Sequence, residues 1–227
     1  MKTKIIWVAL LLIVSTLSAQ DTHQEKNTNN FFRIGGQIGY GLGFNHIDLL
    51  DYDEVNGDNE VVSSGDSSIS GGGGWHVSAT GEYVINHKIG LGINMGYQSS
   101  HLRPILDDAT VRFNRFTFLP TIKYLIALNP RKTNKINVGV GYGFYFGNKM
   151  KFDVGELGGE FNLDYNNAQG FNLITEYEET LRNGGVLTIG LRYYGVSYDI
   201  KELTGDNTFD ELKGSGMDLY LGFSFPL

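Results

Sequence analysis

Seven charged side chains lie in stretches where apolar and polar residues alternate, and they are the first candidates for chemistry. They are Arg33, Glu82, Arg115, Lys123, Glu176, Glu178 and Arg192. Successive side chains of a strand point to opposite faces, so these groups share a face with glycine, Asn and Thr. Unpaired charge inside a protein is costly, so we expect the glutamates to pair with the cations. The favoured interpretation is a polar network that fills a barrel interior, and the alternative is a path for protons or small solutes.

Catalytic chemistry has weaker candidates. The histidines after residue 30 are His46, His76, His87 and His101. His76 and Ser78 share a face of one predicted strand, where a base could contact a nucleophile, as in a lipid-modifying enzyme at the rim of a membrane barrel. The sequence places no acid beside them and contains no nucleophile motif, and His101 with Asp107 and Asp108 is no stronger. We therefore predict that the protein is not an enzyme.

The acidic loops offer oxygen ligands for a hard cation. The first long loop carries Asp48, Asp51, Asp53, Glu54, Asp58 and Glu60, and the last carries Asp206, Asp210 and Glu211. The spacing does not fit an EF-hand, because Val55 falls at the fifth position if Asp51 is the first. The glycine runs at 35–39 and 139–143 lack the helix and the Lys-Ser/Thr ending of a phosphate loop. We predict ordinary solvated loop charge, with no metal and no cofactor.

Eight stretches alternate with period two and are predicted to be strands. Their ranges are 31–44, 73–86, 89–100, 112–128, 136–148, 167–181, 186–200 and 217–227. In the last of these, every odd-numbered residue from Met217 to Leu227 is apolar. So apolar a strand at the end of the chain needs partners on both sides, as a closed barrel provides. Pro120 lacks a backbone donor, so we expect a bulge or a local break in the fourth strand.

The distribution of glycine decides which face points outward. One face of the strands carries nearly every Phe, Leu and Ile, and the other is largely glycine, Asn, Thr and charge. A soluble lipocalin-like barrel or a β-sandwich would turn the apolar face inward and leave glycine outside. With the polar face inward, the glycines make room for the charged side chains in a narrow interior. We therefore predict an all-β fold, an eight-stranded antiparallel up-and-down transmembrane β-barrel over 31–227.

The connections between the predicted strands alternate between long and short, and both termini fall on the side of the short turns. Asn183-Gly184 predicts one of these turns, and 45–72, 149–166 and 201–214 are predicted to be loops. Within the second of them, residues 160–165 could alternatively extend a strand beyond the membrane. Aromatic residues near the strand ends are predicted to form two interfacial girdles. The outer set is Tyr40, Phe44, Trp75, Tyr97, Phe116, Phe144 and Phe146, and the inner set is Tyr83, Tyr124, Phe223 and Phe225.

Residues 1–19 have the features of a secretory signal peptide. Lys2 and Lys4 precede the apolar run 5–14, and a stretch of mostly small residues ends at Ala19. The polar residues 20–30 are predicted to be a flexible periplasmic leader. Removal of 1–19 leaves 16 basic and 25 acidic residues, a charge of −9 that argues against nucleic acid as a partner. The chain has no cysteine, which excludes a disulfide framework.

The stretch 220–227 resembles the C-terminal insertion signal of bacterial outer-membrane barrels. That signal has a polar residue, a glycine two positions later and hydrophobic residues at the last and third-from-last positions, here Tyr220, Gly222, Phe225 and Leu227. The usual final residue is Phe, and Leu227 departs from it. With the strand pattern, this makes the chain similar to the eight-stranded outer-membrane β-barrel proteins over nearly all of its length after residue 19.

The resemblance implies a location in the bacterial outer membrane with both termini in the periplasm. It also implies outer-membrane lipid and the barrel-insertion machinery as partners, with an envelope or surface protein as a possible further one. The function we predict is non-enzymatic: a barrel with a polar, plugged lumen that acts in envelope structure or in surface interaction through its extracellular loops. The alternatives are a narrow pore for small or hydrophobic solutes and a lipid-modifying outer-membrane enzyme.

Overall fold

The computed structural model describes residues 30–55, 61–102, 110–153, 160–201 and 211–227, and all regular structure in these ranges is β-strand. No helix in them is long and apolar enough to cross a membrane. The strands are β1 Phe31–Gly43, β2 Ile47–Val55, β3 Val61–Ile69, β4 Gly74–Ile85, β5 Ile89–His101, β6 Thr110–Ala127, β7 Asn134–Asp153, β8 Glu160–Asp164, β9 Ala168–Thr180, β10 Val186–Gly195, β11 Ser197–Asp199, β12 Glu211–Lys213 and β13 Gly216–Pro226.

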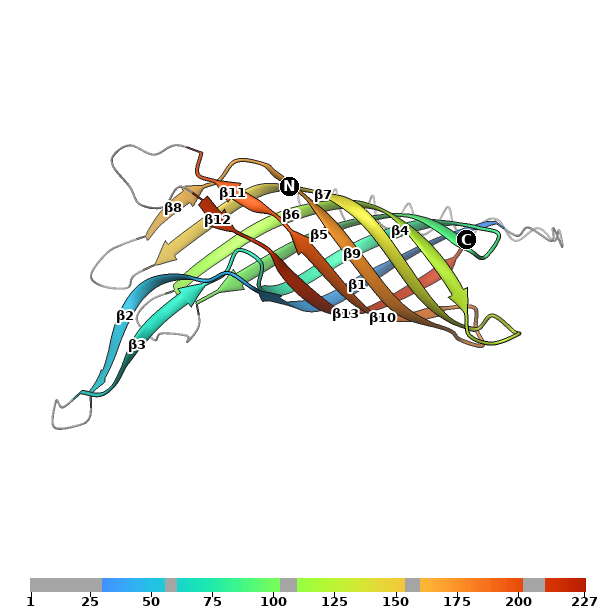
Figure 1. Cartoon of the computed structure of the whole chain (residues 1–227), viewed down its shortest axis with the longest axis horizontal. Helices are drawn as coiled ribbons and strands as arrows, with labels where there is room; N and C mark the ends of the chain where they lie inside the picture. Colours follow the sequence, from blue (N-terminus) through green and yellow to red (C-terminus); the bar gives the residue numbers. More distant parts are fainter. Residues whose placement is uncertain (1–29, 56–60, 103–109, 154–159, 202–210) are drawn as a thin grey trace, which may run out of the picture.

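Eight of these strands form a closed antiparallel barrel, which confirms the predicted fold (Figure 1). The sheet runs β6-β5-β4-β1-β13-β10-β9-β7, and pairing of β6 with β7 closes it. The first and last barrel strands are neighbours, with Ile38 opposite Leu221. Closure leaves no free edge in this part of the sheet, and that allows an apolar terminal strand to be fully paired.

The predicted facing of the strands is also confirmed. Leu91 and Ile189 lie on the outer surface with 46% and 47% of their area exposed, whereas Asn94 and Arg192 point inward and are 6% and 4% exposed. The outer surface therefore presents aliphatic and aromatic side chains and the interior presents polar ones, which is the facing of a barrel whose solvent is lipid.

Tight turns join the strands at one end of the barrel. Asn86 and His87 both have positive φ, and the Lys88 amide donates to the Ile85 carbonyl at 2.9 Å. In the predicted Asn183-Gly184 turn only the glycine has positive φ, so the loop takes one residue more than a two-residue hairpin. The termini of the barrel lie at this same end, where the Leu227 amide donates to the Phe32 carbonyl at 2.8 Å.

The opposite end carries strand extensions, and here the loop predictions for 45–72 and 201–214 were wrong in part. For 149–166, β8 agrees with the alternative of a strand at residues 160–165. Within 45–72, β2 and β3 pair as a hairpin that projects beyond the barrel (Figure 1). Within 149–166, β7 continues to Asp153 and pairs with β8, and within 201–214, β12 pairs with β11. The predicted seventh strand likewise leaves the barrel at Gly195 and continues as β11. Backbone pairing forms these extensions although their side chains do not alternate cleanly.

Two departures from regular pairing affect the site. Pairing of β6 with β7 lapses at Leu119 and Pro120 and resumes in the same register, so the predicted effect of Pro120 is a local break. A bulge lies instead opposite Arg115, where the register shifts and Gly147 has a φ of +63°. A residue inserted in one strand reverses the faces of the side chains beyond it.

An apolar core closes the barrel at the extended end, and the sequence analysis had not predicted it. Its buried members come from the four barrel strands β6, β7, β9 and β10, from residues that adjoin barrel strands, and from the extensions. They are Ile69, Leu102, Val111, Phe113, Leu119, Tyr145, Met150, Tyr165, Ala168, Tyr194, Val196, Tyr198 and Leu212. We call this group the apolar roof.

Candidate functional site in the barrel lumen

An ion cluster occupies the lumen toward the short turns. Arg33 lies directly opposite Glu82 in the sheet, and its Nε donates to Glu82 Oε2 at 2.9 Å. The same guanidinium also pairs with Glu178 across the lumen. Lys123 Nζ lies 2.9 Å from Glu176 Oε2 and 3.1 Å from Glu82 Oε2. Five of the seven predicted lumen charges therefore form one connected cluster.

The charges of this lower cluster balance. Lys135 is a buried cation whose position in β7 lies opposite Glu178. With it, three cations, Arg33, Lys123 and Lys135, face three carboxylates, Glu82, Glu176 and Glu178. Buried charge is tolerable when it is paired and hydrogen-bonded, so the balance accounts for six ionisable groups in so narrow an interior.

Glycines in neighbouring strands provide the space for these long side chains. A Cβ added to Gly90 would lie 1.9 Å from Glu82 Oε1, and one added to Gly139 would lie 2.6 Å from Lys123 Cγ. Tyr220 crosses Gly190 of β10 in the same way, and its hydroxyl donates to Glu176 at 2.8 Å. The glycine-rich inner face is therefore what allows cross-strand packing of large polar groups.

A second cluster lies nearer the extended end and is centred on Asp218. Its carboxylate accepts hydrogen bonds from Gln98 at 3.2 Å and from the Tyr194 hydroxyl at 3.1 Å. Arg192, which lies opposite Asp218 in the sheet, approaches it to 3.9 Å and donates to Gln37 at 3.0 Å. The guanidinium of Arg192 also lies over the Tyr220 ring, 4.9 Å from its centre, so this residue links the two clusters.

Arg115 connects the second cluster to the apolar roof. Its guanidinium donates to Gln98 at 2.6 Å, to the Tyr198 hydroxyl at 2.7 Å and to the Gly71 carbonyl. These partners belong to a barrel strand, to the extension β11 and to the segment that follows β3. Burial raises the pKa of Tyr198 to about 12, so its hydroxyl stays neutral beside the arginine at ordinary pH. One buried side chain thus ties the extensions to the barrel wall.

The free space between these groups is small. The cavity around the lower cluster has a volume of about 40 Å³, and the one between Asp218 and Arg115 has about 10 Å³, roughly the space of one water. Toward the extended end, the apolar roof follows. The described residues therefore leave water-sized pockets in the lumen rather than a wide passage.

Comparison of the whole fold with solved structures finds outer-membrane barrel proteins. The chain superposes on the crystal structure of the outer membrane protein OprG from Pseudomonas aeruginosa with a TM-score of 0.50 and 11% identity, over 88% of this chain and 96% of that one. It superposes on the solid-state NMR structure of the outer membrane protein AlkL in lipid bilayers with a TM-score of 0.50 and 15% identity, over 91% and 93%. The fold is that of the eight-stranded outer-membrane barrels. No protein-family model and no curated protein sequence matches the chain.

Within this outer-membrane barrel fold, the enzyme candidates do not assemble a site. His76 and Ser78 are both buried in the lumen rather than at a rim. Ser78 accepts a hydrogen bond from Asn94 at 2.8 Å, while His76 Nδ1 lies 3.8 Å from Asp218 Oδ2. His46, His87 and His101 lie apart from them, and Asp107 and Asp108 are outside the described residues. Neither ring nitrogen of His76 forms a hydrogen bond with Ser78 or with any other residue that the structure describes.

The metal candidates fall largely outside the described residues. Asp58, Glu60, Asp206 and Asp210 lie there, and for Asp51, Asp53 and Glu54 only the backbone of β2 is described. Asp48 and Glu211 are in β2 and β12. Within the ranges that the structure describes, no three His, Cys, Asp or Glu side chains group to hold a metal ion.

Sequence reasoning missed several functional partners of the network. Asp218 and Tyr194 lay on predicted inner faces but were not included, and the neutral partners Gln37, Gln98 and Asn137 lacked a signal because they bear no charge. The predicted insertion-signal residues lie on both faces of β13. Tyr220 is buried in the lumen, and Gly222 is also on the inner face, where a Cβ added to it would lie 3.1 Å from the Gln37 side chain. Phe225 and Leu227 are on the outer face and are about half exposed.

Proposed function

We propose that this chain is an integral outer-membrane barrel with a plugged lumen, which acts at the cell surface through the extensions at its roofed end rather than as a channel. The observation that supports the proposal is that the interior holds a polar network and, beyond it, the apolar roof. Eight strands enclose only enough room for side chains, and here side chains fill it.

The membrane location is supported by the height of the apolar band. On β6 the outward, even-numbered residues from Phe116 to Ile126 are all apolar or aromatic. Ten residues of a strand tilted by about 40° span roughly 25 Å. That height matches the apolar belt of outer-membrane barrels. Figure 1 shows the extensions at one end of this band and the C-terminus at the other.

The orientation of the barrel in the membrane follows from the difference between its two ends. The short-turn end with both barrel termini faces the periplasm, and β2, β3, β8, β11 and β12 face the exterior. Among the described strands, β2 and β3 form a sheet with each other alone, and such a two-stranded hairpin suits contact with another envelope or surface component through strand addition.

Site-directed labelling tests the orientation directly, because the chain has no cysteine of its own. Lys213→Cys lies at the extended end and Lys132→Cys in a short turn. We expect an impermeant maleimide to label the Lys213 variant on intact cells and the Lys132 variant only after the outer membrane is opened. The reverse pattern would overturn the orientation, and equal labelling of both in a soluble fraction would overturn the membrane location.

Conductance tests the plug. Purified protein in a planar lipid bilayer is expected to give no steady single-channel current. Arg115→Ala, which removes the link between the roof and the wall, is expected to give transient openings. A steady current through the unaltered protein would refute the closed lumen and support the narrow-pore alternative instead.

A further inference from the structure

A row made of one histidine and two cations, here called the cation row, faces outward at the extended end of β5, β6 and β7. His101 lies directly opposite Arg112, and Arg112 lies directly opposite Lys151. Opposite residues on one face of an antiparallel sheet have Cβ atoms about 5 Å apart, so the three side chains are immediate neighbours. Arg112 and Lys151 are exposed and His101 is partly exposed. A chain of net charge −7 thus concentrates positive charge on one strip of its outer wall.

The bulge in β7 creates this row. Inward residues of β7 are odd-numbered up to Tyr145 and even-numbered from Asn148 onward, because the inserted residue near Gly147 reverses the faces. Without it, Lys149 and Lys151 would point into the apolar roof and Met150 would point outward. The bulge therefore sends both lysines to the outer surface.

The cation row runs parallel to the outer aromatic girdle. Tyr97, Phe116 and Phe146 form a row of opposed residues below it, with the rings of Phe116 and Phe146 stacked at 6.0 Å. The cations lie four residues further along β5 and β6, which corresponds to about 10 Å along the membrane normal. Aromatic girdles mark the level where acyl chains meet headgroups, and long cationic side chains reach back toward it.

An open groove adjoins the row. It has a volume of about 260 Å³ and is lined by Trp75, Ser99, His101, Leu102, Thr110, Val111 and Arg112. Trp75 is 59% exposed on the outer wall. An indole, two hydroxyls and a guanidinium around one groove are groups that bind a phosphorylated sugar or glycerol headgroup.

Within the part of the chain that the structure describes, Arg112 and Lys151 have no acidic partner. Neither Arg112 nor Lys151 forms an ion pair with any residue that the structure describes, whereas the neighbouring Lys149 is paired with Asp164 at 3.2 Å. The nearest outward acid along β7, Asp153, lies two residues further from the membrane and opposite Glu160. Along β7, Lys151 thus lies on the membrane side of Asp153, and the acid nearer the membrane, Asp164, is already paired with Lys149.

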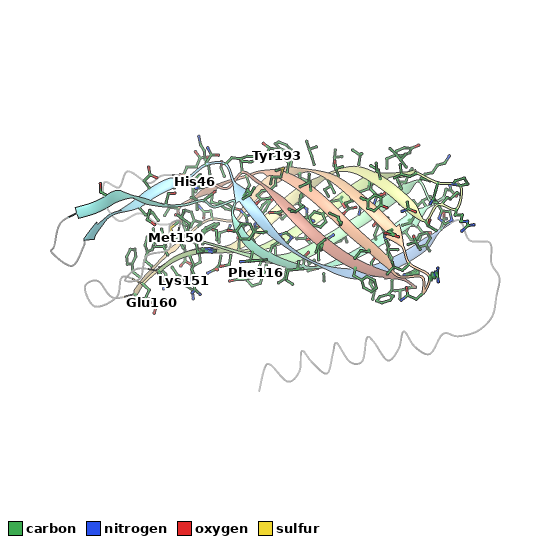
Figure 2. The ribbon with its side chains drawn as sticks, turned by 90° about the horizontal axis from the view of Figure 1, so that it is seen from below. His46, Phe116, Met150, Lys151, Glu160 and Tyr193 are labelled. Atoms are coloured by element: carbon green, nitrogen blue, oxygen red, sulfur yellow. The ribbon has the colours of Figure 1, made fainter. Side chains whose placement is uncertain are left out.

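Among the described residues, the other barrel strands carry no outward-facing cation near their extended ends. The outward side chains near these ends include Leu42 in β1, Trp75 in β4, Phe171 in β9 and Tyr193 in β10. Figure 2 shows Phe116 and Lys151 along one side of the barrel and Tyr193 on the other. The charge is therefore confined to one sector of the wall and is not a ring around the barrel.

We propose that His101, Arg112 and Lys151, with the groove beside Trp75, form a binding site for the phosphate group of an outer-leaflet lipid. The proposal rests on the membrane location and orientation proposed above, but not on the closed lumen. A fixed anionic lipid on this sector would give the barrel a preferred lateral neighbour and leave the rest of its wall to ordinary lipid.

Binding of bisphosphorylated lipid A to the purified barrel in a maltoside detergent tests the site, with dephosphorylated lipid A as the companion probe. Arg112→Gln with Lys151→Gln is expected to weaken binding of the phosphorylated lipid about tenfold or more. The matched control is Lys201→Gln with Lys213→Gln, which removes two exposed cations from the same end, and we expect it to change binding less than about twofold. Equal weakening by both pairs, or none by the first, would overturn the site.

A second measurement does not depend on how the variants fold. Trp75 is the only tryptophan after residue 19, so tryptophan fluorescence reports on the groove. In the unaltered protein the emission is expected to shift with phosphorylated lipid A and not with the dephosphorylated lipid. Identical responses to the two lipids would refute phosphate recognition. Since this assay runs in detergent, failure of the labelling or conductance tests above is distinguishable from failure here.

Discussion

The ion pair between Lys123 and Glu176 gives the most direct test of how the lumen is stabilised. Glu176 is 3% exposed, and its carboxylate accepts from Lys123 at 2.9 Å, from Tyr220 at 2.8 Å and from Asn137 at 3.2 Å. Glu176→Gln removes one of three negative charges from the balanced lower cluster. Lys123 would keep Glu82 at 3.1 Å as its other carboxylate.

The expected cost follows from the number of partners lost. Removal of one member of a buried ion pair costs about 3–5 kcal/mol, and we expect about 3 kcal/mol because Glu82 still neutralises part of the lysine charge. Lys123→Met removes the other member. It is expected to cost about 3 kcal/mol as well, since Glu176 keeps its hydrogen bonds from Tyr220 and Asn137.

The double variant separates charge balance from simple loss of contacts. With both changes, Arg33 and Lys135 remain to face Glu82 and Glu178, and the balance is restored. We therefore expect the double variant to cost about 3 kcal/mol rather than the sum of about 6, a coupling energy of about 3 kcal/mol.

Urea unfolding in lipid vesicles, followed by the fluorescence of Trp75, measures all four free energies of unfolding. The matched control cycle uses Lys149→Met and Asp164→Asn, a pair of similar length at 3.2 Å whose side chains are 40% and 58% exposed. Its coupling should stay below about 1 kcal/mol. Additive costs in the buried cycle, or a buried coupling no larger than the exposed one, would refute the role assigned to charge balance.

Three further predictions concern single positions. Gly190→Ala places a Cβ 2.3 Å from Tyr220 Cζ and should cost about 1–3 kcal/mol in urea unfolding, whereas Gly36→Ala, whose Cβ meets nothing nearer than 3.5 Å, should cost less than about 1. Arg115→Met should leave the barrel folded in a heat-mobility assay but speed proteolysis near Gly71 and β11, and Arg115→Lys should rescue this only in part because it lacks the fork of donors. Phe225→Ser, on the outer surface beside Phe223 at 4.6 Å, should slow membrane assembly in cells more than it lowers stability in detergent, and equal losses in both would contradict a signalling role for the insertion motif.

Strand positions and facing were predictable because period-two alternation is a local property of the sequence. Leu91 and Asn94, for example, are assigned to opposite faces by their own stretch. The glycines then indicated which face of the strands points into the barrel, since a face of glycine and charge fits only a polar interior. These inferences needed no knowledge of which strand pairs with which.

Partners in the lumen depend on register, and register is fixed locally only across tight turns. The turn at Asn86-His87 sets Glu82 opposite Gly92, but β1 meets β4 across a long connection, so nothing in the sequence placed Arg33 opposite Glu82. The pairing of Arg192 with Asp218 has the same origin, because β10 and β13 are also joined by a long connection.

The apolar roof and the extensions other than β8 were missed for a different reason. Val111 and Phe113 carry a usable signal, since they continue the inner face of Arg115 with apolar residues. Met150 carries none, because the bulge at Gly147 reverses the alternation of β7 just before it. A bulge depends on the partner strand, so a pattern within one strand cannot reveal it.

The two levels of the lumen solve the burial of charge in different ways. The lower cluster matches three cations with three carboxylates. The upper one has two arginines and one aspartate, and its excess cation is compensated by aromatic faces and a carbonyl: Arg115 lies 5.0 Å from the Tyr194 ring centre and donates to Gly71. Neutral partners of this kind belong to the roof and the extensions, so the arginine is satisfied only when these segments are docked. The barrel wall and its extended end are therefore stabilised together. If the segment after β3 or the extension β11 moved away from the wall, the buried Arg115 would lose its partners there.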